Sequence, residues 1–283
     1  MIRLDAASFL LQWAVGGLFF LWVTTRRREV GLGYGWLMRG IYGLMALGAV
    51  GLGPALGPVP VRDVAALGVV AATGVALGVS IRRKEAGVAG QREVVERRTA
   101  RVAAMTGIDR EEQRFDRSVP EFPPALDLVA PAIGVIGLIA AGIDAGSPAW
   151  LSVLRLLVGA GFLGAVTDAM LLGHWYLVQP GLARGPLLEL VRWTAILWPL
   201  EVIALLIPTG MWSVLNGTID DGYGGILGWM WVTCAVTTIG LILVTRAALK
   251  ERQYAAVMAA TGLLYLAILT AFGTDLVARA VLA

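Results

Sequence analysis

The chain has 283 residues, of which 58% are hydrophobic and 15% are charged, and its mean hydropathy is +0.76. Soluble domains are about 45–50% apolar and about 25% charged, so this composition excludes a soluble globular protein. The net charge of +3 arises from arginines that follow a membrane pattern, and it does not indicate a nucleic-acid partner. We therefore expect an integral membrane protein of the all-α class, whose first partner is the lipid bilayer.

About 20 helical residues cross a bilayer core that is about 30 Å thick. Apolar stretches of this length predict a polytopic bundle of about eight transmembrane helices. In chain order they cover residues 8–25, 35–57, 62–81, 127–143, 149–178, 187–214, 224–246 and 254–277. The chain thus divides into 1–81 with three spans, a charged cytoplasmic segment 82–126, and 127–283 with five spans, all in one membrane domain.

Basic residues give the predicted helices a direction. Seventeen of the 23 lysines and arginines fall on one side of the predicted membrane, in the loops after the first, third, fifth and seventh spans, and three fall on the other. Cytoplasmic loops carry the excess of basic residues, so both termini are expected outside the cytoplasm. Arginine greatly outnumbers lysine, and Ala, Gly and Val are abundant, which is typical of GC-rich bacterial genomes. We accordingly expect a bacterial inner membrane.

Segment 82–126 is the one long polar stretch of the sequence, with ten basic and eight acidic residues. Its valine spacing predicts a short amphipathic helix over 89–105, and Asp109 with Glu112 predicts the start of a second helix. Such a segment would dock a cytoplasmic partner or lie on anionic headgroups. The alternative is a solvated linker of mixed charge.

Four ionisable residues of the fifth and sixth spans are the candidates for chemistry: Asp168, His174, Arg192 and Glu201. An Asp or Arg at the centre of a membrane helix costs about 2.5–3.5 kcal/mol on the insertion scale, so these side chains are expected to face protein or water. At 1.5 Å per residue they form a ladder from the cytoplasmic boundary to the midplane. The connection between the two spans is short, which predicts antiparallel neighbours and brings Arg192 within reach of Asp168.

Three interpretations of this group remain open. In the first, Asp168 and Glu201 exchange protons with His174 and bulk water. In the second, His174, Trp175 and Tyr176 form the rim of a quinone site near the headgroup level. In the third, Arg192 neutralises Asp168, and His174 with Trp175 anchors the interface.

Other cofactors are disfavoured by the residue inventory. Haem with two histidine ligands needs a second histidine, and the sequence has one histidine and one cysteine, Cys234. Zinc needs three or four converging ligands, which no part of the sequence offers. The remaining buried charges have simpler explanations: Arg39 and Arg155 are expected to snorkel from span ends, and Asp275 with Arg279 to pair one turn apart.

These patterns favour a proton- or quinone-handling membrane subunit of a redox assembly, which would have other redox subunits as partners. The first alternative is a secondary transporter of a small solute or ion, with Asp168 and Glu201 as proton-coupling carboxylates. The second is a membrane scaffold that recruits a cytoplasmic partner through segment 82–126. The sequence leaves open whether the chain is an enzyme.

Overall fold

A computed structural model describes residues 5–93, 115, 116, 118–179, 182–207, 210–251 and 253–282. It is an all-α protein, 83% helical, and no strand occurs within the described residues. The first half contains α1 (Ala6–Thr25), α2 (Leu32–Leu56), α3 (Pro60–Arg82), η1 (Lys84–Ala86), η2 (Pro124–Leu128) and α5 (Val129–Asp144). The second half contains α6 (Ala149–Val178), α7 (Gly185–Leu206), α8 (Met211–Leu215), α9 (Ile226–Lys250) and α10 (Tyr254–Leu282).

Seven helical segments in the described part of the chain are long and apolar enough to cross a membrane. They are α1, α2, α3, η2 with α5, α6, α9 and α10. Helix α7 is not among them although it has 22 residues, because it contains the charged residues Glu189, Arg192 and Glu201. The all-α class is therefore confirmed, with seven helices suited to crossing a membrane, whereas an eighth crossing depends on α7.

The helix bounds agree with the predicted spans within a few residues, except at the end of the sixth span. That span was expected to reach residue 214, but α7 ends at Leu206. Ile207 is extended (φ −95°, ψ 165°), as expected for a residue that precedes a proline, here Pro208. The short helix α8 follows as a separate element.

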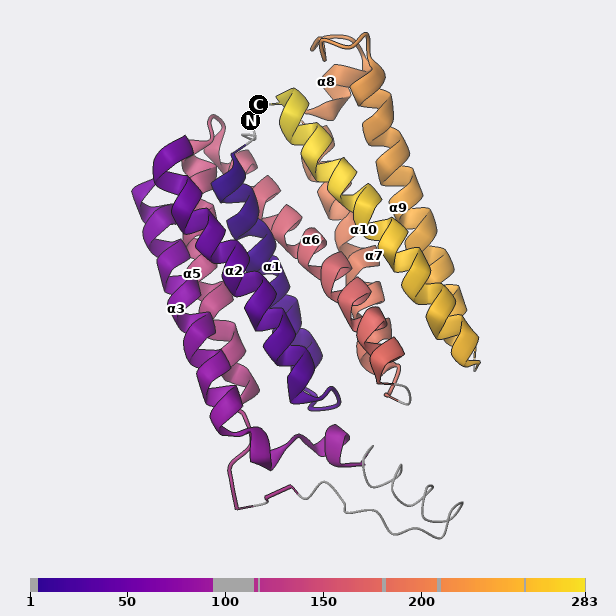
Figure 1. The fold of residues 1–283 in the computed structure, drawn as a ribbon. Helices are drawn as coiled ribbons and strands as arrows, with labels where there is room; N and C mark the ends of the chain where they lie inside the picture. Colours follow the sequence, from indigo (N-terminus) through magenta and orange to yellow (C-terminus); the bar gives the residue numbers. More distant parts are fainter. Residues whose placement is uncertain are drawn as a thin grey trace.

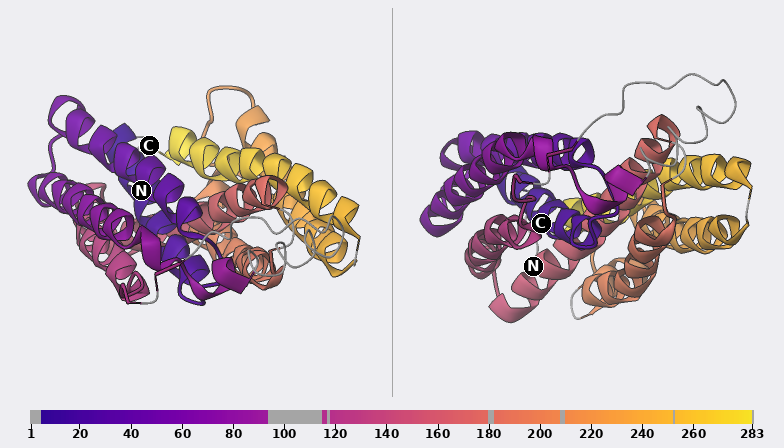
Figure 2. Two further views of the ribbon diagram at one scale, coloured as in Figure 1. Left: turned by 60° about the horizontal axis from the view of Figure 1, so that its bottom comes forward. Right: turned by 90° about the horizontal axis from the view of Figure 1, so that it is seen from below.

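The helices form two groups that meet along α1 and α6. Helices α1, α2, α3 and α5 pack together, and so do α6, α7, α9 and α10. Views along the bundle show the two groups side by side, with α6 running between them (Figure 2). The beginning of α1 and the end of α10 lie at the same end of the molecule (Figure 1).

Helices α1 and α6 cross with their backbones in contact. A Cβ atom on Gly16 would lie 1.7 Å from the carbonyl oxygen of Ala160, and one on Gly164 would lie 2.2 Å from the carbonyl carbon of Gly16. Small residues at such a crossing let two membrane helices approach closely and gain van der Waals contact. The two halves of the bundle are therefore joined by a contact between the backbones of α1 and α6, at Gly16 and Gly164.

The next residue of α1 admits an aromatic ring in the same way. A Cβ atom on Gly17 would lie 1.9 Å from Cζ of Tyr42, so the hydroxyl end of this α2 ring lies against the backbone of α1. Tyr42 is fully buried, and its hydroxyl group passes α1 to reach Asp168 on α6. The Gly16-Gly17 pair thus brings three helices to one point.

A buried ion pair connects the turn before α5 to α2. Arg39 donates from Nε and Nη2 to the two carboxylate oxygens of Asp127, each over 2.8 Å, and the Arg39 guanidinium lies 4.4 Å from the ring centre of Phe122. Both charged side chains are 2% exposed. Arg155 is also buried, so the prediction that Arg39 and Arg155 snorkel to the interface is wrong.

Segment 82–126 packs under the bundle where the structure describes it. Glu121 accepts ion pairs from Arg28 of the α1–α2 turn and from Arg92, and the amide of Gly90 donates to the carbonyl of Arg28. Residues 89–93 are helical, in line with the expected helix at 89–105. The rest of that helix, and Asp109 with Glu112, lie outside the described residues.

The loop before α9 is organised by one carboxylate. Asp221 accepts hydrogen bonds from the backbone amides of Tyr223, Gly225 and Leu227, each over 2.9 Å. These donors stabilise the charged carboxylate and lower the pKa of Asp221 below its usual value. Gly225, at φ 85°, supplies the left-handed residue from which α9 starts.

We expect Gly164→Ala to destabilise the protein by about 1–3 kcal/mol, because the new methyl group meets the backbone of α1. Thermal unfolding in detergent, followed by circular dichroism, measures the effect. Gly262→Ala in α10 is the matched control, since a Cβ atom there meets nothing within 4 Å. Equal unfolding temperatures for the two variants would show that the crossing of α1 and α6 is looser than described.

Asp127→Asn should cost about 3–5 kcal/mol, because it leaves the guanidinium of Arg39 buried without its counter-ion. The same unfolding measurement tests this, with Glu251→Gln as the control at an exposed carboxylate. A replacement of both partners, Arg39→Met with Asp127→Leu, should recover most of the loss. If Asp127→Asn unfolds like the control, the ion pair does not hold η2 in place.

Candidate functional site

Besides the ion pairs of Arg39 and Arg62, the described residues contain two clusters of buried polar side chains, which lie at different levels of the bundle. The first joins α1 and α10. Arg279 donates from Nε to Asp275 over 2.6 Å and from Nη2 to Oε1 of Gln12, and Gln12 donates to Asp275 over 3.4 Å. None of the three side chains is exposed. The expected pairing of Asp275 with Arg279 is confirmed, and Gln12 completes a fully buried triad.

A glycine of α6 also makes room for this triad. A Cβ atom on Gly159 of α6 would lie 2.5 Å from Nε2 of Gln12 and 3.2 Å from Oδ1 of Asp275. The triad therefore rests on the bare backbone of α6, one helical turn from Arg155. This glycine sets how closely α1 and α10 approach α6.

Arg155 and Glu201 extend the triad towards α7. Arg155 donates to the carbonyl oxygens of Ala204 and Ile207, over 2.9 and 2.8 Å, where the end of α7 leaves carbonyl groups free. Glu201 is fully buried and interacts electrostatically with Asp275, Arg279 and Arg155. We call Gln12, Arg155, Glu201, Asp275 and Arg279 the Glu201 cluster.

Both carboxyl oxygens of Glu201 are buried and have no hydrogen-bond partner among the described residues. The indole nitrogen of Trp231 is likewise without a partner, and Trp231 packs in the same apolar cluster as Leu205, one turn from Glu201. Buried polar groups are normally satisfied, and unsatisfied ones mark a place for water, an ion or a proton. The hydrogen bonds of the Glu201 cluster are therefore incomplete, so stabilising the fold does not account for it fully.

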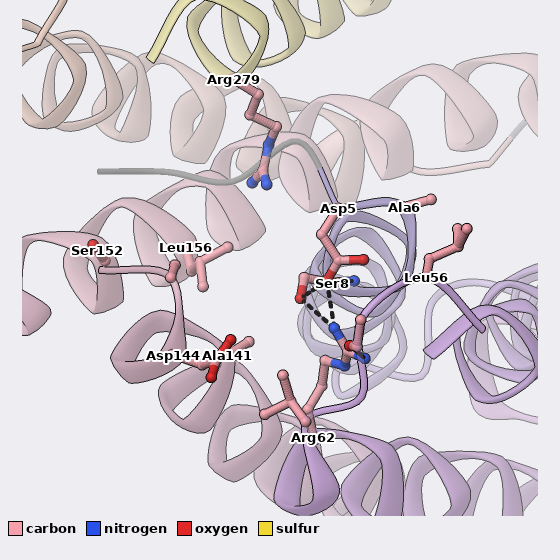
Figure 3. A pocket seen from close by; sticks show the side chains of 13 residues that line it. Asp5, Ala6, Ser8, Leu56, Arg62, Ala141, Asp144, Ser152, Leu156 and Arg279 are labelled. Atoms are coloured by element: carbon pink, nitrogen blue, oxygen red, sulfur yellow. Dashed lines mark hydrogen bonds and ion pairs between the residues drawn. The ribbon is translucent and has the colours of Figure 1, made fainter. Parts of the chain in front are cut away.

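A cavity of about 440 Å³ opens beside the Glu201 cluster, at the end of the bundle that holds the termini. Figure 3 shows Arg279 pointing into this terminal cavity from one side and Arg62 lying on another. Arg62 is held by Asp5, Asp63 and the carbonyl of Gly57, so its hydrogen-bonding groups are occupied. The polar residues around the cavity are Asp5, Ser8, Arg62, Asp144, Ser152 and Arg279.

The second cluster surrounds Asp168 on α6. Asp168 is fully buried, and one carboxyl oxygen accepts a 2.5 Å hydrogen bond from the Tyr42 hydroxyl. The other oxygen has no hydrogen-bond partner in the part of the chain that the structure describes. The Tyr34 hydroxyl, two turns from Tyr42 on α2, donates to the backbone carbonyl of Asp168 over 3.4 Å. Two tyrosines of α2 therefore bond to the same residue of α6, one to its carboxyl group and one to its backbone carbonyl.

From Asp168 a row of hydroxyl groups continues towards the end of α6. Tyr34 interacts with Thr24 of α1 and with Tyr176 of α6. Tyr176 donates to the carbonyl of Ala183 in the α6–α7 connection over 2.5 Å. We call Thr24, Tyr34, Tyr42, Asp168 and Tyr176 the Asp168 cluster.

The two clusters are separated along the bundle axis. Gly161 of α6 lies beside Leu197 of α7, and Arg155 reaches Ala204, so these antiparallel helices place Glu201 level with about residue 157. That level is about 16 Å from Asp168 at 1.5 Å per residue. The expected antiparallel neighbours are found, but Asp168 and Glu201 belong to different centres.

The other predicted site residues lie outside both centres, with the exception of Tyr176. His174 is exposed, and its Nδ1 lies 3.1 Å from the hydroxyl of Tyr265. Arg192 is also exposed, whereas Asp168 is buried, and no ion pair joins them in the described part of the chain. Trp175 borders the Asp168 cluster, because it packs against Gly33 and its ring centroid lies 6.0 Å from that of Tyr34, whereas the hydroxyl group of Tyr176 donates to Ala183.

The sequence analysis missed several members of the two clusters. Gln12, Tyr34 and Tyr42 were passed over because one uncharged polar residue in an apolar stretch is a weak signal. Their spacing offered a clue only for the tyrosines, which lie eight residues apart and so on one face of a helix. Nothing in the sequence near Gln12 indicates that its partner is 263 residues away.

Metal binding receives no support from the described residues, in which no three His, Cys, Asp or Glu side chains converge. Trp13 makes a further link at the level of Asp168 by donating to Thr167 over 2.9 Å. The chemistry that the two clusters offer is the uptake and release of protons by carboxyl groups in a dry interior.

No protein-family model, curated protein or solved structure matches this sequence, so the site is defined by its own geometry.

Proposed function

We propose that this membrane protein moves protons, with Glu201 as the proton-binding group and the terminal cavity as its access from one side of the membrane. The unpartnered carboxyl group of Glu201 carries the proposal. A buried ionised carboxylate without donors is costly, whereas the protonated group is tolerated. Its state is therefore sensitive to the arrangement of Arg155 and Arg279 around it.

The contacts around Arg279 support access from the cavity. Arg279 lines the cavity and binds Asp275 and Gln12, and Asp275 interacts with Glu201. Water in the cavity would thus reach the cluster through one arginine. A shift of Arg279 away from Asp275 would change the charge balance at Glu201, which couples occupancy of the cavity to protonation.

The Asp168 cluster supplies the route on the other side. Hydroxyl groups both donate and accept hydrogen bonds, so Tyr34, Tyr42 and Tyr176 suit the transfer of a proton between Asp168 and the α6–α7 connection. About 16 Å separate the two carboxyl groups along the axis. Transfer between them requires water or a movement of the two helix groups about the α1–α6 crossing.

This arrangement favours a secondary transporter of a small solute or ion over a redox subunit. The terminal cavity has the volume of a small-ligand site, and buried carboxylates at two levels suit alternating access. The quinone-handling alternative keeps one observation in its favour, the His174–Tyr265 pair on the exposed face of the bundle. Recruitment of a partner by segment 82–126 also stays a prediction.

We further propose that α7 crosses the membrane, so that the bundle has eight spans with both termini outside the cytoplasm. An even number of crossings agrees with the termini lying at one end (Figure 1). Burial of Glu201 against α6 and α10 removes the main obstacle to insertion of α7. The excess of arginine in the loops at the opposite end supports this orientation, and a bacterial inner membrane remains the expected location.

Purified protein in liposomes should conduct protons when a potassium gradient with valinomycin imposes a membrane potential, and a trapped pH-sensitive dye reports the influx. We expect Glu201→Gln to reduce the rate to that of protein-free liposomes, because the amide cannot exchange a proton. Glu189→Gln is the matched control on the same helix, since Glu189 lies in ion pairs near its beginning. Wild-type protein no faster than empty liposomes, or a Glu201→Gln variant as fast as wild type, would refute the proposal.

Tyr42→Phe should slow the same proton influx between about twofold and tenfold, because it removes the donor that orients Asp168. Tyr223→Phe is the control, at an exposed tyrosine outside the helices. An unchanged rate for Tyr42→Phe, with loss of flux in Glu201→Gln, would place the route elsewhere and leave Asp168 a structural residue.

A further inference from the structure

Helices α1 and α7 meet in a seam at the end of the bundle opposite the termini. The rings of Phe20 on α1 and Trp193 on α7 are in contact, with centroids 6.2 Å apart. Beyond this contact Arg26 and Arg27, which follow α1, both bind Glu189 of α7. The seam therefore combines an aromatic contact with a set of charges at its edge.

The charges at this seam are unbalanced. Glu189 is shared by two arginines, and Arg192, one turn further along α7, adds a third positive charge on the same face. Arg192 is exposed and forms no hydrogen bond or ion pair with any described residue. It lies about 10 Å from the beginning of α7, where a long side chain reaches the headgroup level.

Aromatic side chains border the charges. The Arg26 guanidinium lies 5.1 Å from the ring centre of Trp22, and Trp193 is 36% exposed beside Arg192. Tryptophans at such positions lie at the level of lipid headgroups. Phe19, also exposed, continues the apolar surface towards the middle of α1.

We propose that this seam binds the phosphate headgroup of an anionic phospholipid. Arg192 and Arg26 donate to the phosphate, Trp22 and Trp193 lie beside the glycerol region, and an acyl chain follows the exposed apolar side chains. Basic pockets between transmembrane helices bind anionic headgroups through the same chemistry. Glu189 limits the affinity, because it competes for Arg26 and Arg27. The inference does not depend on proton movement.

Native mass spectrometry of the delipidated full chain tests this site, with phosphatidylglycerol and phosphatidylcholine of identical acyl chains as probes. We expect preferential binding of phosphatidylglycerol, about tenfold weaker in Arg192→Gln. Arg246→Gln is the control, at an exposed arginine of α9 without the aromatic neighbours. Glu189→Gln should act in the opposite direction and strengthen binding, because it releases Arg26 and Arg27.

Circular dichroism and gel filtration establish that each variant is folded, and Arg192→Lys, which keeps the charge, should retain part of the binding. Equal binding of the two lipids would overturn the proposal. So would an equal loss in Arg192→Gln and Arg246→Gln, since that result means attraction by net charge alone. Failure here leaves the proton influx of the wild-type protein unaffected, so the two proposals are tested separately.

Discussion

The backbone contact between α1 and α6 determines where the polar groups of this protein lie. Gly16 and Gly164 let the helices touch, and Gly17 lets the ring of Tyr42 pass to Asp168 on the far side of α1. Further along the same two helices, Gly159 admits Gln12 and Asp275. In lipid the hydrophobic effect does not drive helices together, so close packing and hydrogen bonds must do so. Both polar clusters depend on glycines that leave room for them.

Much of the architecture could be predicted from the sequence, because unpaired backbone groups and charged side chains are costly in hydrocarbon. Few arrangements of the chain avoid that cost. Apolar length predicted the helices, and α6 has the expected bounds, 149–178. The spacing of Asp275 and Arg279 predicted their pairing, since residues four apart share a helix face. The depth of Asp168 and Glu201 predicted that both would face protein, and both are fully buried.

Partners between distant helices were not predictable, because helical periodicity says which face is polar but not which helix covers it. Arg192 and Asp168 were placed together by assuming that α6 and α7 begin and end at one level. The two residues do lie at nearly the same level, but the side chain of Arg192 is exposed whereas Asp168 is buried, and Tyr42 of α2 takes the place expected for Arg192. Arg39 was expected to reach the interface, yet its counter-ion lies in the turn before α5. Such contacts depend on the tertiary arrangement of helices that are far apart in sequence.

The separation of partners along the chain also constrains the order of assembly. Arg39 is synthesised 88 residues before Asp127, so α2 reaches the membrane while its guanidinium has no counter-ion. An arginine at the centre of a membrane helix opposes insertion by about 2.5–3.5 kcal/mol, and one near the beginning of a helix, as Arg39 is in α2, opposes it less. The pair with Asp127 forms only once η2 and α5 have been synthesised. Final burial of the first hairpin is therefore a late event in biogenesis.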